Sequence, residues 1–157
     1  MNNLDSIEKL IQKDKYQVFL FTCRATVPFN FARHSWFVVN KKGVLSRWEI
    51  CWKADELKTN WGHLYKDFYP LLQGIEMFFF SKKYFFKANL LSFIEGGPDS
   101  VAHQMTEFIE ASPKTYPHCY KYSLKGPNSN TYTQWVLNNF PESKMRLSWN
   151  SVGNNKV

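Results

Sequence analysis

The amino-acid sequence predicts an α+β domain in which an antiparallel sheet is covered by helices. Three observations predict this class. Residues 16–24 form a nearly uninterrupted apolar run, which is typical of a strand buried on both faces. Residues 34–40 and 44–52 are β-rich and are separated by a short glycine-containing turn, as in a hairpin. Residues 100–111 and 128–140 carry apolar side chains at helical spacing.

The elements before residue 99 follow from local signals. A helix is expected over Leu4–Lys13, because Asp5 can cap it and Glu8 completes a capping box. The segment 26–32 contains a proline and predicts a loop. The aromatic-rich segment 74–94 favours strands or an aromatic platform.

The later elements are also predicted from caps and breakers. Asp99 is the expected cap of the helix 100–111, and Ser112-Pro113 is expected to end it. Strands are predicted over Cys119–Leu124 and Arg146–Trp149. We expect one domain over residues 1–157, with an N-terminal helix within 1–15 and a flexible tail over 150–157.

Composition supports a packed domain with a basic surface. Of 157 residues, 44% are hydrophobic and 18% are aromatic, so either a bulky aromatic core or an aromatic-lined groove is possible. The net charge of +7 favours anionic partners. The basic residues are scattered, however, and the longest runs are Lys41-Lys42 and Lys82-Lys83. Specific nucleic-acid binding is therefore not expected.

Cysteine and histidine spacing argues against a metal site. Cys23, Cys51 and Cys119 form no CxxC pair, and their apolar flanks predict buried free thiols. Neither an HExxH motif nor a close histidine pair is present, so we expect no metal and no cofactor. The first residues do not resemble a signal peptide, and no apolar run is long enough to span a membrane. The sequence as written predicts a cytoplasmic protein, unless a dedicated secretion system delivers it.

Three residues suggest hydrolytic chemistry. His34 opens a strand, Glu49 lies on the return strand, and Ser129 begins a helix after Gly126-Pro127. A histidine base, a carboxylate that orients it, and a serine nucleophile beside free helix N–H groups form a hydrolase constellation. Alternatively, His34 makes a structural hydrogen bond, Glu49 is solvated and Ser129 caps its helix.

Three blocks of the sequence resemble an uncharacterised bacterial family, catalogued as domain of unknown function 3750. The blocks are Ala32–Trp36 with the return strand 47–50, Tyr116-Pro117 with the run Gly126–Tyr132, and Leu147–Gly153. The resemblance covers about residues 24–153. Here Gly153-Asn154-Asn155 departs from the Gly-Lys-Asp that usually closes the family pattern.

A second, looser resemblance concerns the order of the site residues. A strand histidine followed by an Asn-Cys turn at a helix start is similar to circularly permuted papain-like hydrolases and acyltransferases, such as NlpC-type amidases and lecithin:retinol acyltransferase. In this chain Ser129 stands where those proteins have cysteine. The resemblance implies a permuted papain-like architecture, with His34 as base, Glu49 as orienting residue and the N–H groups after Asn128 as oxyanion donors.

Two functions follow from these resemblances. The first is a hydrolase or acyltransferase that acts on an amide or ester of a small molecule, peptide or lipid, with Arg33, Trp36, Asn128 and Asn130 contacting the substrate. The second is an inactive binding module of the same fold that holds an anionic ligand or a protein partner. The sequence does not predict the oligomeric state or choose between a Ser–His enzyme and a scaffold that binds without cleavage.

Overall fold

A computed structural model of the chain describes residues 7–56 and 60–157. Its strands are β1 (Tyr16–Arg24), β2 (Arg33–Lys41), β3 (Val44–Ile50), β4 (Leu64–Lys66), β5 (Gln73–Phe78), β6 (Ser81–Lys87) and β7 (Asn89–Gly96). Its helices are α2 (Val101–Thr115), α3 (Ser129–Asn139) and the short 3₁₀ helix η1 (Pro141–Ser143). The larger sheet is antiparallel with strand order β4-β3-β2-β1-β7. The predicted α+β class is therefore confirmed.

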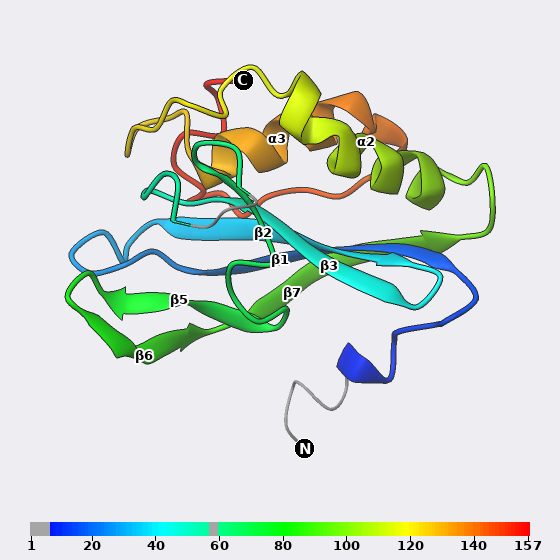
Figure 1. Cartoon of the computed structure of the whole chain (residues 1–157), viewed down its shortest axis with the longest axis horizontal. Helices are drawn as coiled ribbons and strands as arrows, with labels where there is room; N and C mark the ends of the chain where they lie inside the picture. Colours follow the sequence, from blue (N-terminus) through cyan, green and yellow to red (C-terminus); the bar gives the residue numbers. More distant parts are fainter. Residues whose placement is uncertain (1–6, 57–59) are drawn as a thin grey trace.

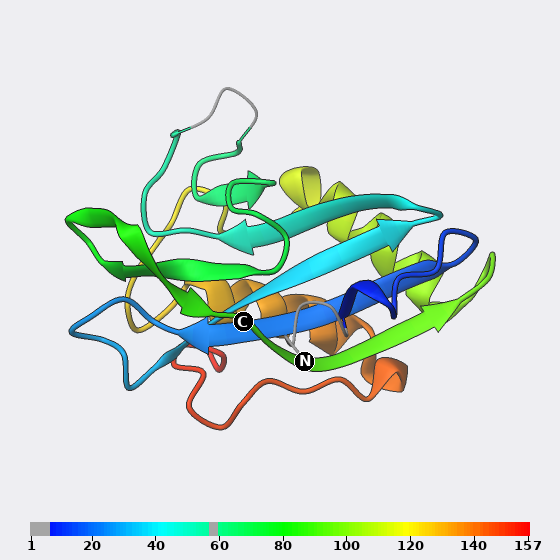
Figure 2. The same ribbon diagram turned by 90° about the horizontal axis from the view of Figure 1, so that it is seen from below.

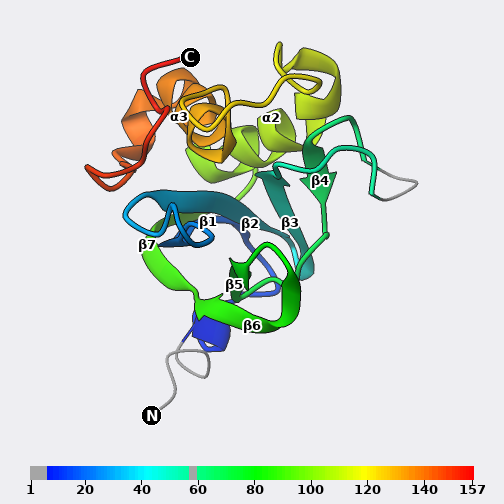
Figure 3. The ribbon, with the colours of Figure 1, turned by 90° about the vertical axis from the view of Figure 1, so that its left-hand side faces the viewer.

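The sheet separates two layers. Helices α2 and α3 lie on one face, and the β5–β6 hairpin lies on the other (Figures 1 and 3). Seen from the hairpin side, β5 and β6 cover only one end of the sheet (Figure 2). Ile7, Leu10 and Ile11 also pack on that face, in the same apolar cluster as Phe19 and Phe21.

Strand β1 is central because its side chains are apolar on both faces. It pairs with β2 along its whole length and with β7 on the other side. Val18 and Leu20 point to the helices, whereas Phe19 and Phe21 point to the hairpin. This alternation explains why the sequence of β1 is an almost continuous apolar run, and it confirms the predicted bounds.

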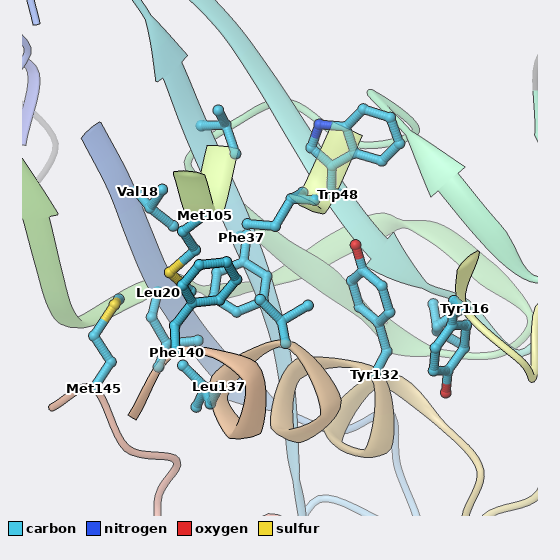
Figure 4. Packing of buried hydrophobic residues seen from close by; sticks show 14 of the residues in the cluster. Val18, Leu20, Phe37, Trp48, Met105, Tyr116, Tyr132, Leu137, Phe140 and Met145 are labelled. Atoms are coloured by element: carbon cyan, nitrogen blue, oxygen red, sulfur yellow. The ribbon is translucent and has the colours of Figure 1, made fainter. Parts of the chain in front are cut away.

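The core on the helix side is built around helix α3. Tyr132, Leu137 and the following Phe140 face the sheet residues Leu20 and Phe37 (Figure 4). The Tyr132 hydroxyl, which is fully buried, shares a 2.9 Å hydrogen bond with the Ser112 hydroxyl of α2. The two helices are thus joined to each other as well as to the sheet.

Helix α2 begins and ends differently from the prediction. Ser100, not Asp99, is its cap, because Asp99 adopts a left-handed φ of 64° while the Ser100 hydroxyl accepts from the His103 N–H. The helix also continues past Pro113 to Thr115. A proline cannot donate to the carbonyl four residues earlier, and here the Ser112 hydroxyl donates to that Ile109 carbonyl at 2.6 Å. The missing backbone hydrogen bond is thereby replaced.

Two predicted strands are wrong, and one predicted helix ends earlier than expected. Residues 119–124 and 146–149 are turns and extended loops without a strand partner in the described sheets. The Cys119 carbonyl accepts from His63 N–H, and Ser123 N–H donates to Pro127, so these backbone groups are satisfied by loops. The helix predicted over Leu4–Lys13 falls partly outside the described residues; of its described part, only residues 7–8 are helical.

The segment expected to be a flexible tail is docked on the start of helix α3. The Val152 carbonyl accepts from the side-chain amides of Asn128 (3.1 Å) and Asn130 (2.9 Å). The Gly153 carbonyl accepts from the Thr131 hydroxyl at 2.7 Å. The polar residues at the helix start therefore fix the closing segment.

We expect a chain that lacks residues 152–157 to be less stable by about 2–4 kcal/mol, because the three hydrogen bonds from Asn128, Asn130 and Thr131, at about 0.5–1.5 kcal/mol each, are removed. Urea denaturation would measure the free energy of unfolding. A chain that lacks only residues 154–157 keeps all three acceptors and is the matched control, with a change within about 1 kcal/mol. Equal losses in both truncations would contradict this role of the closing segment.

Candidate functional site

The candidate site lies where strand β2 begins and helix α3 begins. His34 is the second residue of β2, and Ser129 is the first residue of α3. Both residues line one pocket with a volume of about 700 Å³. The structure therefore brings two of the three predicted catalytic residues to the same cavity.

The third residue, Glu49, contacts the histidine directly. His34 Nε2 lies 2.7 Å from Glu49 Oε2, and both side chains are at least nine-tenths buried. The hairpin register explains the contact: Phe37 lies opposite Trp48, and both face the helices, so His34 and Glu49 share the opposite face. Glu49 is thus not solvated, and the alternative interpretation of this residue is wrong.

A buried arginine compensates the charge of Glu49. Arg47 Nε lies 2.6 Å from Glu49 Oε1, and Arg47 Nη2 donates to Glu49 Oε2 at 2.9 Å. Arg47 Nη1 donates to the carbonyls of Pro70 and Gln73. Sequence reasoning did not select this residue. The signal was present, because Arg47 and Glu49 are two charges on one face of an otherwise apolar strand.

Trp36 supports this arginine and lies away from the pocket. It is fully buried, and the Arg47 guanidinium lies over its ring at 4.1 Å from the centroid. Its indole N–H donates to the Leu71 carbonyl at 3.2 Å. We expected Trp36 to contact substrate. Its ring instead packs against the Arg47 guanidinium and helps to hold that group beside Glu49.

The charges determine the protonation of the site. Burial by itself raises the pKa of Glu49, but Arg47 and His34 outweigh it, and the pKa lies below its ordinary value. Glu49 is therefore a carboxylate at neutral pH and accepts a hydrogen bond from the Nε2–H group of His34. A ring that carries its proton on Nε2 has its lone pair on Nδ1. Nδ1 has no hydrogen-bond partner among the described residues and is not enclosed.

The start of helix α3 leaves Ser129 free of a capping role. Asn128 is the cap: its side-chain oxygen accepts from the N–H groups of Asn130 and Thr131. The Ser129 hydroxyl has no partner among the described residues and is not one of their enclosed unpaired polar atoms, so it is open to the pocket. The interpretation of Ser129 as a cap is therefore wrong.

The N–H groups after Asn128 differ in what they can bind. Those of Asn130 and Thr131 are already engaged by Asn128, whereas the Ser129 N–H has no acceptor within the described residues. Of the expected oxyanion donors, the Ser129 N–H is the one that remains available. It lies at the positive end of the helix dipole.

Asn130 joins the parts of the site. Its side-chain oxygen accepts from the Ser35 hydroxyl at 2.8 Å, and its amide donates to the carbonyls of Arg33 (2.8 Å) and Val152 (2.9 Å). Because these hydrogen bonds use its polar atoms, Asn130 positions the helix start beside strand β2 and is not free to bind substrate through them. Arg33 and Asn128 also line the pocket, although the Asn128 amide and carbonyl oxygen are committed internally.

Ser129 and His34 line the same pocket. No hydrogen bond joins the Ser129 hydroxyl to the imidazole in the described part of the chain. Contacts between a base and a nucleophile are often long before substrate binds, and they shorten in the complex with substrate. Cys51 also lines the pocket, but burial, together with the negative charge of Glu49, raises the pKa of its thiol well above the ordinary value. A thiolate nucleophile is not available there.

The fold and the site define an α+β protein with a buried Arg–Glu–His chain at the edge of a large pocket. A family model described as "Protein of unknown function (DUF3750)" matches residues 15–155, and the chain belongs to this family. Searches of curated proteins and of solved structures give no significant match. Among the helices that the structure describes, none combines the length and apolar character needed to cross a membrane.

We expect Arg47→Met to lower the free energy of unfolding by about 3–5 kcal/mol, because it leaves the Glu49 carboxylate buried without its cation. The double variant Arg47→Met/Glu49→Gln should recover part of this loss. Lys41→Met, which breaks an exposed 2.7 Å pair with Glu110, is the control and should cost less than about 1 kcal/mol. Urea denaturation measures all three, and a loss equal to that of the control would contradict a buried charge pair.

The pH dependence of stability should report Glu49. Its pKa is lower in the folded chain than in the unfolded chain, where it is about 4.3, so its contribution is present above that pH and is lost as the pH falls through the folded value. The free energy of unfolding of the wild type should therefore decrease more steeply on acidification than that of Glu49→Gln. The difference in slope is up to about 1.4 kcal/mol per pH unit. Parallel curves from pH 7 to about 3 would contradict it.

Proposed function

We propose that this protein is a serine hydrolase or acyltransferase that acts on an ester or amide. One observation carries the proposal: Glu49 holds His34 at 2.7 Å through Nε2, His34 and Ser129 line one pocket, and neither His34 Nδ1 nor the Ser129 hydroxyl has a hydrogen-bond partner among the described residues. The parts needed for an activated alcohol are a base, a group that orients the base, and a nucleophile.

The proposed reaction uses these parts in order. The Ser129 oxygen attacks the substrate carbonyl carbon, and the hydroxyl proton passes to His34 Nδ1. The Ser129 N–H stabilises the negative oxygen of the tetrahedral intermediate. The bond to the leaving alcohol or amine then breaks, and the leaving group takes the proton from His34. Water, or a second alcohol or amine, attacks the acyl-Ser129 ester by the same route and frees the serine.

Serine rather than cysteine makes the base essential. A helix N-terminus can bring a thiol close to ionisation at neutral pH, but an alcohol starts from a much higher pKa. Ser129 therefore needs proton removal during attack, and the imidazolium that forms needs a nearby anion. Glu49, held as a carboxylate by Arg47, meets this need.

The order of strand His34, strand Glu49 and helix-start Ser129 supports a permuted papain-like architecture as part of this proposal. The chain resembles NlpC-type amidases and lecithin:retinol acyltransferase in that order, with an alcohol in place of the thiol. An inactive binding module of the same fold is the rival function.

The test is a fluorophosphonate probe with a p-nitrophenyl acetate assay. The wild type should gain one covalent phosphonyl group on Ser129, found by mass spectrometry of the tryptic peptide. Ser129→Ala should abolish labelling and lower ester hydrolysis at least about a thousandfold, and His34→Ala should behave alike. Ser123→Ala, which changes an exposed serine of the loop before α3, is the matched control and should retain both the labelling of Ser129 and the ester hydrolysis.

The proposal fails if Ser129→Ala and His34→Ala hydrolyse the ester as the wild type does. Absence of labelling together with ligand binding that survives Ser129→Ala and weakens with salt would support the binding module.

A further inference from the structure

We infer that the substrate of this site carries a long aliphatic acyl chain, which lies in the pocket beside His34 and Ser129. The inference rests on the proposed function, because it places the acyl carbonyl at Ser129. It adds the class of acyl group, which the catalytic residues alone do not specify.

The size and lining of the pocket carry the inference. Its volume of about 700 Å³ lies within the range typical of sites that enclose small molecules. Apart from the polar residues at its catalytic edge and from Thr26, Glu76 and Lys125, the wall is aromatic and aliphatic. Residues that form this apolar wall include Phe29, Phe31, Trp52, Ile75, Phe79 and Leu124. An amide- or sugar-rich substrate would find few polar partners on such a wall, whereas an alkyl chain needs none.

The apolar wall is built by packing between separate parts of the chain. Phe79, in the turn between β5 and β6, meets Phe29 edge-on at 6.3 Å and Trp52 at 5.2 Å between ring centroids. Phe29 belongs to the loop before β2, and Trp52 follows β3. The rings therefore join the hairpin to the edge of the main sheet, and the pocket runs from this junction to the start of helix α3.

The charges around the pocket fit the carboxylate that hydrolysis would release. Arg33 and Lys125 line the cavity, and neither has an ion-pair partner among the described residues. Glu76 is the acidic residue of the lining, and the Tyr69 hydroxyl donates to its carboxylate. A fatty acid would thus meet cations at its polar end and an apolar wall along its chain.

Binding is tested in Ser129→Ala, so that catalysis plays no part. A dansyl-labelled long-chain fatty acid is the probe, and acetate, octanoate and palmitate compete with it below their critical micelle concentrations. Each methylene group that becomes buried should strengthen binding up to about fourfold, so palmitate should displace the probe and acetate should not. Competition that does not depend on chain length would overturn the inference.

Two adjacent phenylalanines offer a matched pair of variants. Phe79 lines the pocket, whereas Phe80 is 89% exposed and lies outside the lining. In the Ser129→Ala background, Phe79→Asp should weaken fatty-acid binding at least about tenfold, and Phe80→Asp should change it less than about twofold. Leu124→Asp, on the opposite segment of the lining, repeats the test if Phe79→Asp does not fold by circular dichroism. Equal effects of the Phe79 and Phe80 changes would overturn the inference.

Wild-type hydrolysis of p-nitrophenyl acetate, octanoate and palmitate separates this inference from the proposed function. Ser129-dependent hydrolysis without chain-length preference would leave the proposed function standing and remove the acyl pocket. Chain-length-dependent binding in Ser129→Ala without hydrolysis by the wild type would support the acyl pocket and remove the proposed function.

Discussion

The buried ion pair between Arg47 and Glu49 is the constraint on which the rest of the site depends. Two charges inside an apolar sheet are tolerated only if each is paired and hydrogen-bonded. Arg47 Nε and Glu49 Oε1 form a 2.6 Å ion pair without hydrogen-bond geometry. Glu49 Oε2 contacts His34 and accepts from Arg47 Nη2, while Arg47 lies over the ring of Trp36 and donates to the carbonyls of Pro70 and Gln73. These carbonyls come just before and at the start of β5. The same pair therefore orients the histidine and ties the hairpin layer to the sheet.

The start of helix α3 shows how capping and chemistry are divided between neighbours. Asn128 binds the free N–H groups of the first turn, so Ser129 does not have to. Asn130 fixes the helix start to strand β2 and to the closing segment. Asn130 thus brings together parts of the three sequence blocks that resemble the family, around residues 33, 130 and 152, although they lie far apart in the chain. Within the described part of the chain, the groups left without a hydrogen-bond partner there include the Ser129 hydroxyl, the Ser129 N–H and His34 Nδ1.

Periodicity predicted the elements whose partners are local or whose pattern is strong. The bounds of β1, the β2–β3 hairpin and helix α3 follow from apolar spacing, turn residues and caps. Residues 119–124 have a β-like composition but no strand edge to pair with, and composition does not report the partner. Helix α2 passed a proline because a neighbouring serine replaced the lost donor, which is a tertiary detail of one side chain.

The site, like the fold, was predictable only where its residues are close in sequence or follow a strong pattern. His34 and Glu49 could be placed together because they lie on neighbouring strands of a hairpin, and alternation puts them on one face. Arg47 was not selected, because its two-residue spacing from Glu49 on one strand face was not used as a sign of a buried ion pair. Trp36 was assigned to the pocket because it follows His34 on the same strand, but proximity in sequence does not show what covers a side chain, and Trp36 is fully buried. The apolar wall joins segments around residues 29, 52, 79 and 124, and only the tertiary structure brings these together.

The docked closing segment has a consequence for the order in which the molecule is made. The carbonyls of Val152 and Gly153 hold the side chains that begin helix α3, and that helix start carries the candidate nucleophile. The sheet and the His34–Glu49 contact need only residues synthesised much earlier. On the ribosome, the contact between His34 and Glu49 can therefore form long before residues 152 and 153 emerge and fix the helix start that carries the candidate nucleophile.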